Sequence, residues 1–321
     1  MTEDENTGIL GISLIDDQLR IVEGQKHLNE FQITQVAHGR ARQSFGFESF
    51  SDLSMARRFA DDISRLYNTQ NFQVKQAAFS IDSRMVLIKK IPIDSALDEN
   101  QVEDQLIWEV RQFAISPLSE YIVDFERIHS PSTNGLLHHV LVVVVRKKII
   151  EYLKQMFQHT NLFLKVIDVD VFSAQRALQL NYDYNSSDRI GLLDIEEHKI
   201  HFSILSGRNY FLSQDIATTL NDKKVARNDE STTRLISKEI RRIILDQQLG
   251  RGVEDLNEIF LYGEGVEDIV LEGLQNYHNV RIDRANPFKK VKLSTHAKEI
   301  INKARAESFM ISVGAALRGI Q

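Results

Sequence analysis

Two stretches, GISLIDDQLRIV (residues 11–22) and LLDIEEHKIHFS (residues 192–203), share one pattern, and that pattern decides the predicted fold. Each begins with an apolar strand, passes through a short acidic and polar turn, and ends with a second strand of alternating residues. This pattern predicts a β-hairpin whose first strand is buried on both faces. Because the hairpin occurs twice, about half a chain apart, we expect two similar lobes that face each other.

Composition agrees with two lobes and argues against several classes of protein. The chain has 321 residues, of which 42% are hydrophobic, so it can bury a sizeable core. Lys and Arg together number 39 and Asp and Glu 45, a net charge of −6, which argues against a nucleic-acid partner. There is no cysteine, so disulfides and thiolate chemistry are excluded and a reducing compartment is favoured.

The sequence also predicts how the protein relates to membranes. The first seven residues are acidic and polar, unlike a signal peptide. The longest aliphatic run, residues 140–145, is too short to cross a bilayer and suits a buried strand. We therefore expect a soluble cytoplasmic protein that reaches the membrane only through a partner.

Between the two hairpins, residues 85–160 have the order β-α-β-β-α, which predicts an α+β subdomain inserted into the first lobe. Its first strand is expected to end at Pro92. The unit is either a truncated α+β plait or one that a strand at residues 163–167 completes. A helix that starts at the N-cap Asp52 precedes the subdomain. The predicted domains are the first lobe at residues 1–84 and 161–187, the inserted subdomain at 85–160, the second lobe at 188–305 with a helical subdomain at 220–257, and a C-terminal helix at 306–321 that packs on the first lobe.

Several short motifs follow one another along the chain in a characteristic order and spacing. They are WEVR (108–111), ISPL (115–118), VDF (123–125), VVRKK (144–148), VIDV (166–169), IFLYGEG (259–265), NPF (286–288) and SVGAALRG (312–319). Together they resemble the PilM family of type IV pilus assembly proteins, within the actin-like ATPase superfamily, over nearly the whole chain. The resemblance implies an α/β fold of the actin-like kind, a duplicated ribonuclease H-like fold with two lobes and an inserted α+β subdomain.

The hairpins depart from the family pattern where phosphates would bind. In nucleotide-binding members the two hairpins hold the β- and γ-phosphates of ATP, with Asp at the position of Ser13 and Gly at those of Ile15 and Glu196. Glycine lets backbone N–H groups approach phosphate oxygens. Ile15 would block that approach, and a Glu196 carboxylate beside a polyanion would cost on the order of 4 kcal/mol per close contact. We therefore expect little or no magnesium–ATP binding, no cofactor and no enzymatic activity.

Four residues stay as vestigial nucleotide-binding positions: Ser13, Asp194, Gly263 and Gly265. Asp194 could hold a magnesium-bound water or could simply cap the turn at the end of its strand. The Gly263-Glu264-Gly265 segment could be an adenosine-binding turn or a purely structural turn, since a lone Gly-x-Gly is a weak signal.

No metal site or catalytic set is expected. His138 with His139, and His198 with His201, are the histidine pairs that invite a metal interpretation. Adjacent residues on a strand, and residues three apart, point to opposite faces, so neither pair can chelate a metal. The sequence holds no recognisable Ser-His-Asp set, paired carboxylates or P-loop lysine.

The family resemblance implies a peptide partner. PilM proteins bind the short cytoplasmic tail of the membrane protein PilN as an extended peptide, in a groove between the first lobe and the inserted subdomain. We expect Lys89, Trp108 and Arg111 to line that groove, because Trp and Arg are enriched at binding hot spots. The alternative is that Trp108 is a half-buried packing residue and Arg111 an ordinary surface residue.

The preferred function is therefore a non-catalytic cytoplasmic scaffold of a type IV pilus or related secretion machine, with a PilN-like tail and other pilus proteins as partners. A homo-oligomer is left open. One alternative is an active actin-like ATPase. Another is an FtsA-like cell-division filament protein, which would carry an amphipathic C-terminal helix that we do not expect here.

Overall fold

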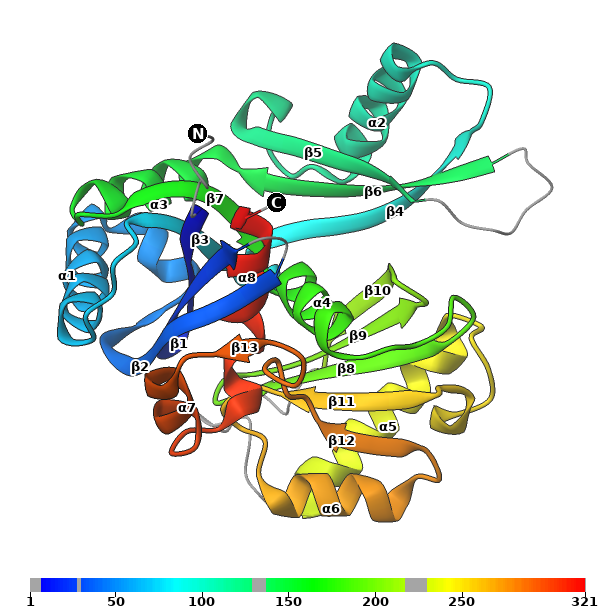
Figure 1. Ribbon diagram of the computed structural model, residues 1–321. Coiled ribbons are helices and arrows are strands. Elements are labelled where there is room, and N and C mark those ends of the chain that lie inside the picture. The colour runs from blue at the N-terminus through cyan, green and yellow to red at the C-terminus, as the bar shows by residue number, and fades with distance from the viewer. Residues whose placement is uncertain (1–6, 28–29, 129–136, 217–229, 321) are drawn as a thin grey trace.

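The computed structural model describes residues 7–27, 30–128, 137–216 and 230–320 of the chain. Its strands form three sheets; Figure 1 shows the two larger sheets in separate lobes and the third at one end of the first lobe. Parts of the predicted domains, including the beginning of the helical subdomain at 220–257, lie outside the described residues.

The first predicted hairpin is one continuous strand, β1 (Thr7–His27), that folds back on itself. A straight strand of its 21 residues would be about 70 Å long. Yet a Cβ atom at Gly8 would lie only 3.6 Å from the backbone oxygen of Gly24. The reversal occurs at Asp16, whose φ of 51° lies in the left-handed region. The prediction of a hairpin here is confirmed.

The first lobe is built on a sheet with the order β13-β2-β1-β3-β7. The first half of β1 pairs with β3 in parallel and the second half pairs with β2 antiparallel, so the folded strand occupies two neighbouring positions. Helix α1 begins as predicted, because the Asp52 side chain accepts a hydrogen bond from the Ser54 N–H. The bounds are β2 (Glu30–Phe45), α1 (Leu53–Thr69), β3 (Gln76–Ile81), β7 (Phe163–Val169) and β13 (Lys292–Leu293).

The small sheet, with the order β4-β6-β5, has helix α2 packed on one face. The prediction that Pro92 ends its first strand is wrong, because β4 continues beyond Pro92, which lies opposite His139 of β6. Strand β4 is an edge strand, where a proline can be accommodated without removing a ladder hydrogen bond. The bounds are β4 (Val86–Asp94), α2 (Glu99–Phe113), β5 (Tyr121–Ile128) and β6 (Leu137–Arg146).

Helix α3 (Lys147–Gln158), which the sequence analysis counted with the inserted subdomain, packs in the first lobe instead. Its inner side chains, among them Ile149 and Leu153, are buried in the same apolar core as Phe59 of α1. Strand β7 likewise pairs with β3 and extends the first sheet. The inserted unit thus consists of β4, α2, β5 and β6, while the other domain boundaries stay predictions.

The second lobe has the sheet order β10-β9-β8-β11-β12. The second predicted hairpin is confirmed, since β8 and β9 are antiparallel and Glu196 lies opposite Lys199 across a two-residue turn. Helices α5 and α6 pack on one face of this sheet. The bounds are β8 (Arg189–Glu196), β9 (Lys199–Ser206), β10 (Asn209–Asp215), α5 (Glu230–Asp246), β11 (Glu258–Tyr262), α6 (Asp268–Tyr277) and β12 (Arg281–Arg284).

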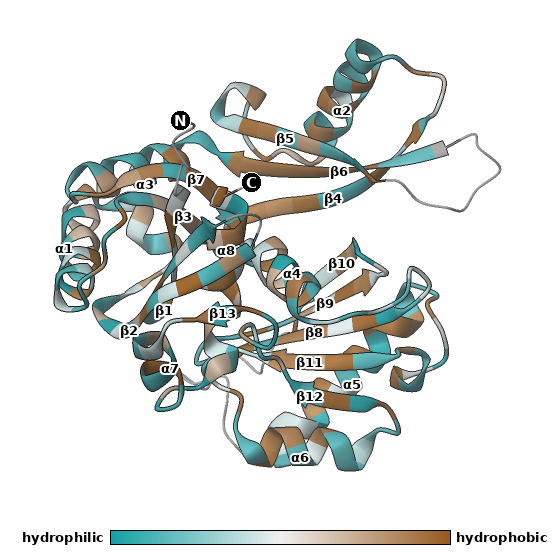
Figure 2. Ribbon diagram, in the orientation of Figure 1, coloured by the Kyte–Doolittle hydropathy of each residue, from teal (hydrophilic) through white to brown (hydrophobic). Residues whose placement is uncertain are grey.

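Two helices, α4 (Asp170–Asn181) and α8 (Met310–Ile320), lie between the two large sheets (Figure 1). Their side chains share one apolar core with Val22 of the first lobe and Leu192 of the second. Figure 2 shows the matching hydrophobic colour along α8 and the strands beside it. Helix α8 also packs against β1 of the first lobe.

A short helix, α7 (Thr295–Ile301), precedes α8 and packs beside β2. Within the described ranges, no helix is long and apolar enough to cross a membrane. The arrangement of the three sheets suggests two candidate functional sites. One is the groove beside the inserted sheet, and the other is the point where the two hairpins meet.

Candidate functional site

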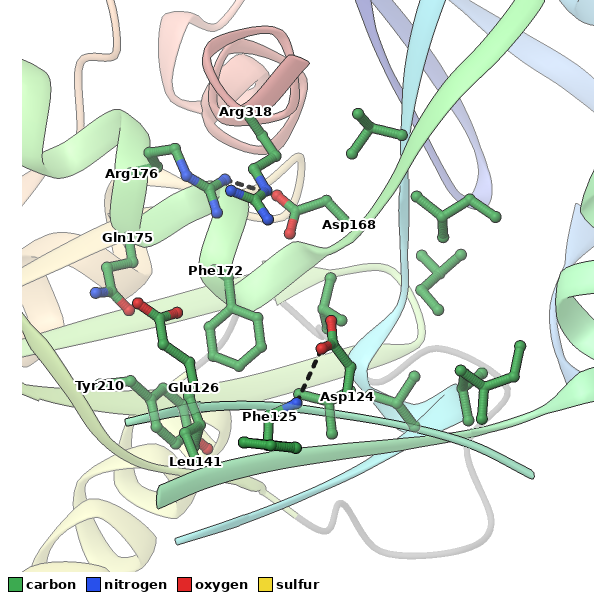
Figure 3. Close-up of a pocket in the computed structure, with 18 of the residues that line it drawn as sticks. Asp124, Phe125, Glu126, Leu141, Asp168, Phe172, Gln175, Arg176, Tyr210 and Arg318 are labelled. Atoms are coloured by element: carbon green, nitrogen blue, oxygen red, sulfur yellow. Dashed lines mark hydrogen bonds and ion pairs between the residues drawn. The ribbon is translucent and has the colours of Figure 1, made fainter. Parts of the chain in front are cut away.

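A groove of about 890 Å³ lies between the inserted subdomain and the first lobe, and we call it the subdomain groove. Strands β5 and β6 line one side, and β7 with helices α3 and α4 the other; β10 and α8 also contribute residues. Figure 3 shows side chains from these elements pointing into the space between them. This is the place where the sequence analysis expected an extended peptide.

The wall formed by the inserted sheet is apolar because of strand alternation. On β6, Leu141 and Val143 face the groove, whereas Val140 and Val142 pack under α2. On β5, Ile122 lines the groove and keeps 39% of its surface exposed. An apolar wall that is only partly covered can gain free energy when a partner covers the rest.

Both sides of the groove also offer a strand edge. Strand β5 ends the order β4-β6-β5, and β7 ends the order β13-β2-β1-β3-β7, among the described strands. Edge strands carry backbone N–H and C=O groups that are not used within their own sheet. An extended segment in the groove could pair with either edge.

Charged side chains give the groove a basic excess, with six basic and three acidic residues lining it. Asp168 is already engaged, since its Oδ2 lies 2.6 Å from Arg176 Nη1 and accepts a hydrogen bond from Ser173 Oγ at 2.6 Å. Arg318, in contrast, makes no hydrogen bond or ion pair with any of the described residues. Figure 3 shows its guanidinium group at the same end of the groove as Arg176, where it can meet a polar group of a partner.

The residues predicted to line the groove lie elsewhere. Lys89 shares a face of β4 with Ile91, which packs under α2, and its Nζ lies 4.0 Å from the centre of the Phe113 ring. Trp108, 59% exposed, and the exposed Arg111 are on α2 itself. Strand alternation places Lys89, and the packing of α2 places Trp108 and Arg111, on the opposite side of the inserted sheet from the groove. Partner binding by these residues stays a prediction, but for a different surface.

The ends of the two hairpins meet each other directly. The backbone N–H of His198, in the second turn, donates to Asp16 Oδ2 in the first turn at 3.2 Å. Arg84 donates to the backbone oxygen of His198 at 3.2 Å and pairs with Asp82 at 2.6 Å. The hydrogen-bonding groups of the turns are therefore used between the lobes.

Beside this contact lies a lysine with three carboxylates, which we call the lysine cluster. Lys199 Nζ lies 2.5 Å from Asp170 Oδ2, 3.0 Å from Asp194 Oδ2 and 3.6 Å from Asp82 Oδ1. All four residues are buried. A buried ammonium group thus lies where carboxylates from both lobes converge.

The structure brings together three of the four predicted nucleotide-binding residues. Gly265 donates its N–H to the backbone oxygen of Ile195, next to Asp194, at 2.8 Å. Gly263 has a φ of 103°, and a Cβ atom there would lie 2.4 Å from the same oxygen, so glycine is required for this turn. Ser13 is buried in the first lobe, opposite Ser80 of β3. Nucleotide binding by these positions stays a prediction.

The residues at the hairpin ends do not fit a magnesium–triphosphate group. Such a group needs free backbone N–H donors and carboxylates that are open to the metal ion. Here Asp16 accepts the His198 N–H, and Lys199 already lies against Asp170 and Asp194. The expected obstacle, Ile15, is instead buried in the apolar core shared by the lobes.

The second expected obstacle, the charge of Glu196, also differs from the prediction. The Glu196 carboxyl is buried and accepts the Glu264 N–H at 3.2 Å. Burial raises its pKa to about 8, although Arg20 acts in the opposite direction. The side chain is therefore mostly uncharged at neutral pH. Its bulk fills the turn, but charge repulsion is not the reason that phosphate is disfavoured.

This pKa leads to a pH prediction for the Glu196→Gln variant. The folded protein holds the Glu196 proton up to about pH 8, whereas the unfolded chain releases it near the ordinary value of 4.5. The folded state therefore binds more protons between these values, and wild-type stability falls as the pH rises through this window. Glutamine cannot ionise. As the pH rises through this window, the free energy of unfolding of the variant should therefore increase by about 4 kcal/mol relative to that of wild type.

Chemical denaturation of both proteins from pH 4.5 to 9 measures this difference. Parallel stability curves for the two proteins would contradict the assignment of a raised pKa to Glu196.

Sequence analysis named Asp194 but missed the other three residues of the lysine cluster, Asp82, Asp170 and Lys199. A usable signal was present, because Asp82 directly follows β3 and Asp170 directly follows β7. These strands are parallel neighbours, so residues after their carboxyl ends meet at one edge of the sheet. Lys199 gave a weaker signal, as a basic residue among acidic ones in the second hairpin.

Comparison with known proteins agrees with this architecture. A family model for the type IV pilus assembly protein PilM matches residues 11–218. A chain in a solved PilM-PilN type IV pilus biogenesis complex is similar, with a TM-score of 0.78, 17% sequence identity and 98% of each chain covered. The α/β actin-like fold class predicted from the sequence is confirmed.

More distant structures resemble the chain as well. The cytoplasmic domain of EpsL, from the type II secretion system of Vibrio cholerae, has a TM-score of 0.48 and 9% identity, with 97% of this chain and 95% of that chain covered. A Bacteroides thetaiotaomicron protein with an actin-like ATPase fold and unknown function has a TM-score of 0.47 and 11% identity, with 94% and 99% covered. Because the family model spans well over half of the sequence, the chain belongs to the PilM family of type IV pilus assembly proteins.

Proposed function

We propose that this chain is a non-catalytic scaffold of a type IV pilus or related secretion machine, and that its subdomain groove binds the short cytoplasmic tail of a PilN-like membrane protein. The main support for this proposal is the groove itself, because it combines an apolar wall with two strand edges. Membership of the PilM family and the likeness to a chain in a PilM-PilN complex support the choice of partner.

An extended tail suits this groove physically. Strand β5 has 8 residues, about 26 Å of edge along which a peptide can form main-chain hydrogen bonds. Alternate side chains of the peptide would lie beside Ile122 on the groove face of the inserted sheet, toward the first lobe, and the intervening ones on the face that carries α2. Arg318 would be available for a backbone carbonyl or a carboxylate of the tail.

The proposal that the chain is not an enzyme has separate support. The two hairpin turns bond to each other, and Lys199 occupies the carboxylates that a metal ion would need. Incubation with magnesium–ATP should therefore release no phosphate above a protein-free blank. The protein would act in the cytoplasm, at the inner membrane through its partner, in contact with other pilus proteins.

The groove is tested by the Ile122→Asp variant. We expect it to bind a synthetic peptide, carrying the tail of the PilN-like protein of the same organism, at least about tenfold more weakly than wild type. Covering the part of Ile122 that is still exposed, 39% of its surface, contributes about 1 kcal/mol, and an aspartate carboxylate covered by the peptide without a partner adds a desolvation cost of at least about 1 kcal/mol. Each 1.4 kcal/mol changes affinity tenfold. Fluorescence anisotropy of the labelled peptide, titrated with the full chain, measures the loss.

The matched control is Trp108→Ala, which removes an exposed apolar side chain from the other side of the same sheet. Its affinity for the peptide should equal that of wild type. The reverse result, in which Trp108→Ala binds weakly and Ile122→Asp binds normally, would move the partner to the α2 surface and refute binding in the groove.

A further inference from the structure

Lys199 lies on the boundary between the lobes, and its partners come from both sides of it. It is the first residue of β9, directly after the second hairpin turn, and its side chain is 1% exposed. Asp82 and Asp170 follow strands of the first sheet, whereas Asp194 belongs to β8 of the second. The ammonium group therefore pairs with carboxylates across the boundary as well as within its own lobe.

Lys199 and Asp82 are each stabilised in their charged forms by this cluster, whereas burial raises the pKa of Asp194 despite the nearby Lys199. Burial alone lowers the pKa of Lys199, but the neighbouring carboxylates, Asp170 foremost, raise it well above its usual value. Burial alone likewise raises the pKa of Asp82, but Lys199 and Arg84 bring it below its usual value. An ammonium group held this way stays charged at neutral pH.

The cluster is also fixed to the backbone. The Oδ1 atom of Asp170 accepts the N–H of Ser83 at 3.0 Å and of Val171 at 2.6 Å, which leaves Oδ2 for Lys199 at 2.5 Å. Both oxygens of this carboxylate are thus used, and its position does not depend on a ligand. Buried ion pairs are favourable only when their remaining hydrogen-bonding capacity is satisfied in this way.

A second ion pair also crosses the boundary between the lobes. Arg20, on the second half of β1 and 3% exposed, pairs with Glu264 at 2.5 Å. Glu264 is the middle residue of the Gly263–Gly265 turn in the second lobe. Together with the hydrogen bonds of Asp16 and Arg84 to the His198 backbone, these ion pairs join the two lobes through groups that belong to the chain itself.

We propose that the Lys199 ammonium is a built-in cation that joins the end of the second hairpin to the edge of the first sheet where β3 and β7 end, so that the lobes reach this closed arrangement without a nucleotide or a metal ion. A divalent cation would have to displace an ammonium already held by three carboxylates. The closed arrangement is then permanent, and the groove walls contributed by β7 and α4, which flank Asp170, keep one shape.

The experiment starts with the full wild-type chain. Its thermal midpoint is measured alone, in EDTA and with excess magnesium–ATP, and it should be the same in all three. A rise with magnesium–ATP, or a fall in EDTA, would overturn the proposal, because either would show that an external group holds the lobes together.

A pair of variants then tests the lysine itself. In Lys199→Met, amide hydrogen exchange in the peptide that spans the second hairpin should be at least about tenfold faster than in wild type, because the hairpin end loses its bond to the first lobe. Lys238→Met, which removes an exposed lysine on α5, should exchange like wild type there. Wild-type exchange in Lys199→Met would refute the role of the lysine. If that variant does not fold, the wild-type melts decide the question.

Discussion

The Gly314→Ala variant is expected to lose at least about 3 kcal/mol of folding free energy and to melt several degrees below wild type. Gly314 lies where α8 crosses α4, and a Cβ atom there would be 1.7 Å from the backbone oxygen of Ser173. Alanine favours a helix over glycine by about 1 kcal/mol, but a backbone clash outweighs that gain. The helix cannot move away, because on its other side a Cβ atom at Gly11 would lie 1.9 Å from the Ser312 oxygen.

Gly46→Ala is the matched control. Gly46 has no neighbour within 4 Å of an added Cβ atom among the described residues, and its φ of −158° suits any residue. It should therefore stay within about 0.5 kcal/mol of wild type. Thermal and chemical denaturation of the three proteins gives the comparison. Equal stabilities of the two variants would contradict the close helix crossing.

The crossing of α4 and α8 also affects the shape of the subdomain groove. Arg176 of α4 and Arg318 of α8 both line it, and Arg176 Nη1 donates to the Gly314 backbone oxygen at 3.3 Å. If the two helices were pushed apart, these side chains would shift relative to β5. The small residues at the crossing therefore support the proposed binding site as well as the core.

The Asp170→Ala variant should lose about 3 to 5 kcal/mol, the range observed when one member of a buried ion pair is removed. It would leave Lys199 without the partner at 2.5 Å and would take the acceptor from the N–H groups of Ser83 and Val171. Unpaired buried donors add to the cost. The free energy of unfolding from chemical denaturation measures the loss.

Asp183→Ala provides the control for charge alone. Asp183 pairs with Lys290 on the surface, and its side chain is 84% exposed. Removing an exposed pair of this kind changes stability by about 1 kcal/mol or less. A loss in Asp170→Ala no larger than in Asp183→Ala would mean that Lys199 finds other partners or water, and would argue against a dry lysine cluster.

Local patterns in the sequence predict the structure correctly where a short segment determines its own conformation. The two hairpins are set by the change from an apolar strand to a polar turn, and both are present. The start of α1 follows from the chemistry of a single side chain, Asp52. The strand at Pro92 was misjudged because a proline ends a central strand but not an edge strand, and position in a sheet is not a local property.

The same limit explains the misplaced site residues. Trp108 and Lys89 were selected by residue type and neighbourhood along the chain, but the face of the inserted sheet that each occupies depends on how the sheet is oriented toward the first lobe. Ile15 was expected at an open turn, yet it lies in a core that forms only when both lobes are packed together.

The sequence by itself determined the duplicated hairpins, the two-lobed α/β fold and the loss of the small residues at the phosphate turns, because each of these is encoded in a contiguous stretch. Only the tertiary structure decided that the turns bond to each other, that Lys199 meets Asp82 and Asp170, and that β5 and β7 form the two edges of one groove. These contacts join residues that are far apart in the chain, and their energies depend on burial that no single segment possesses alone.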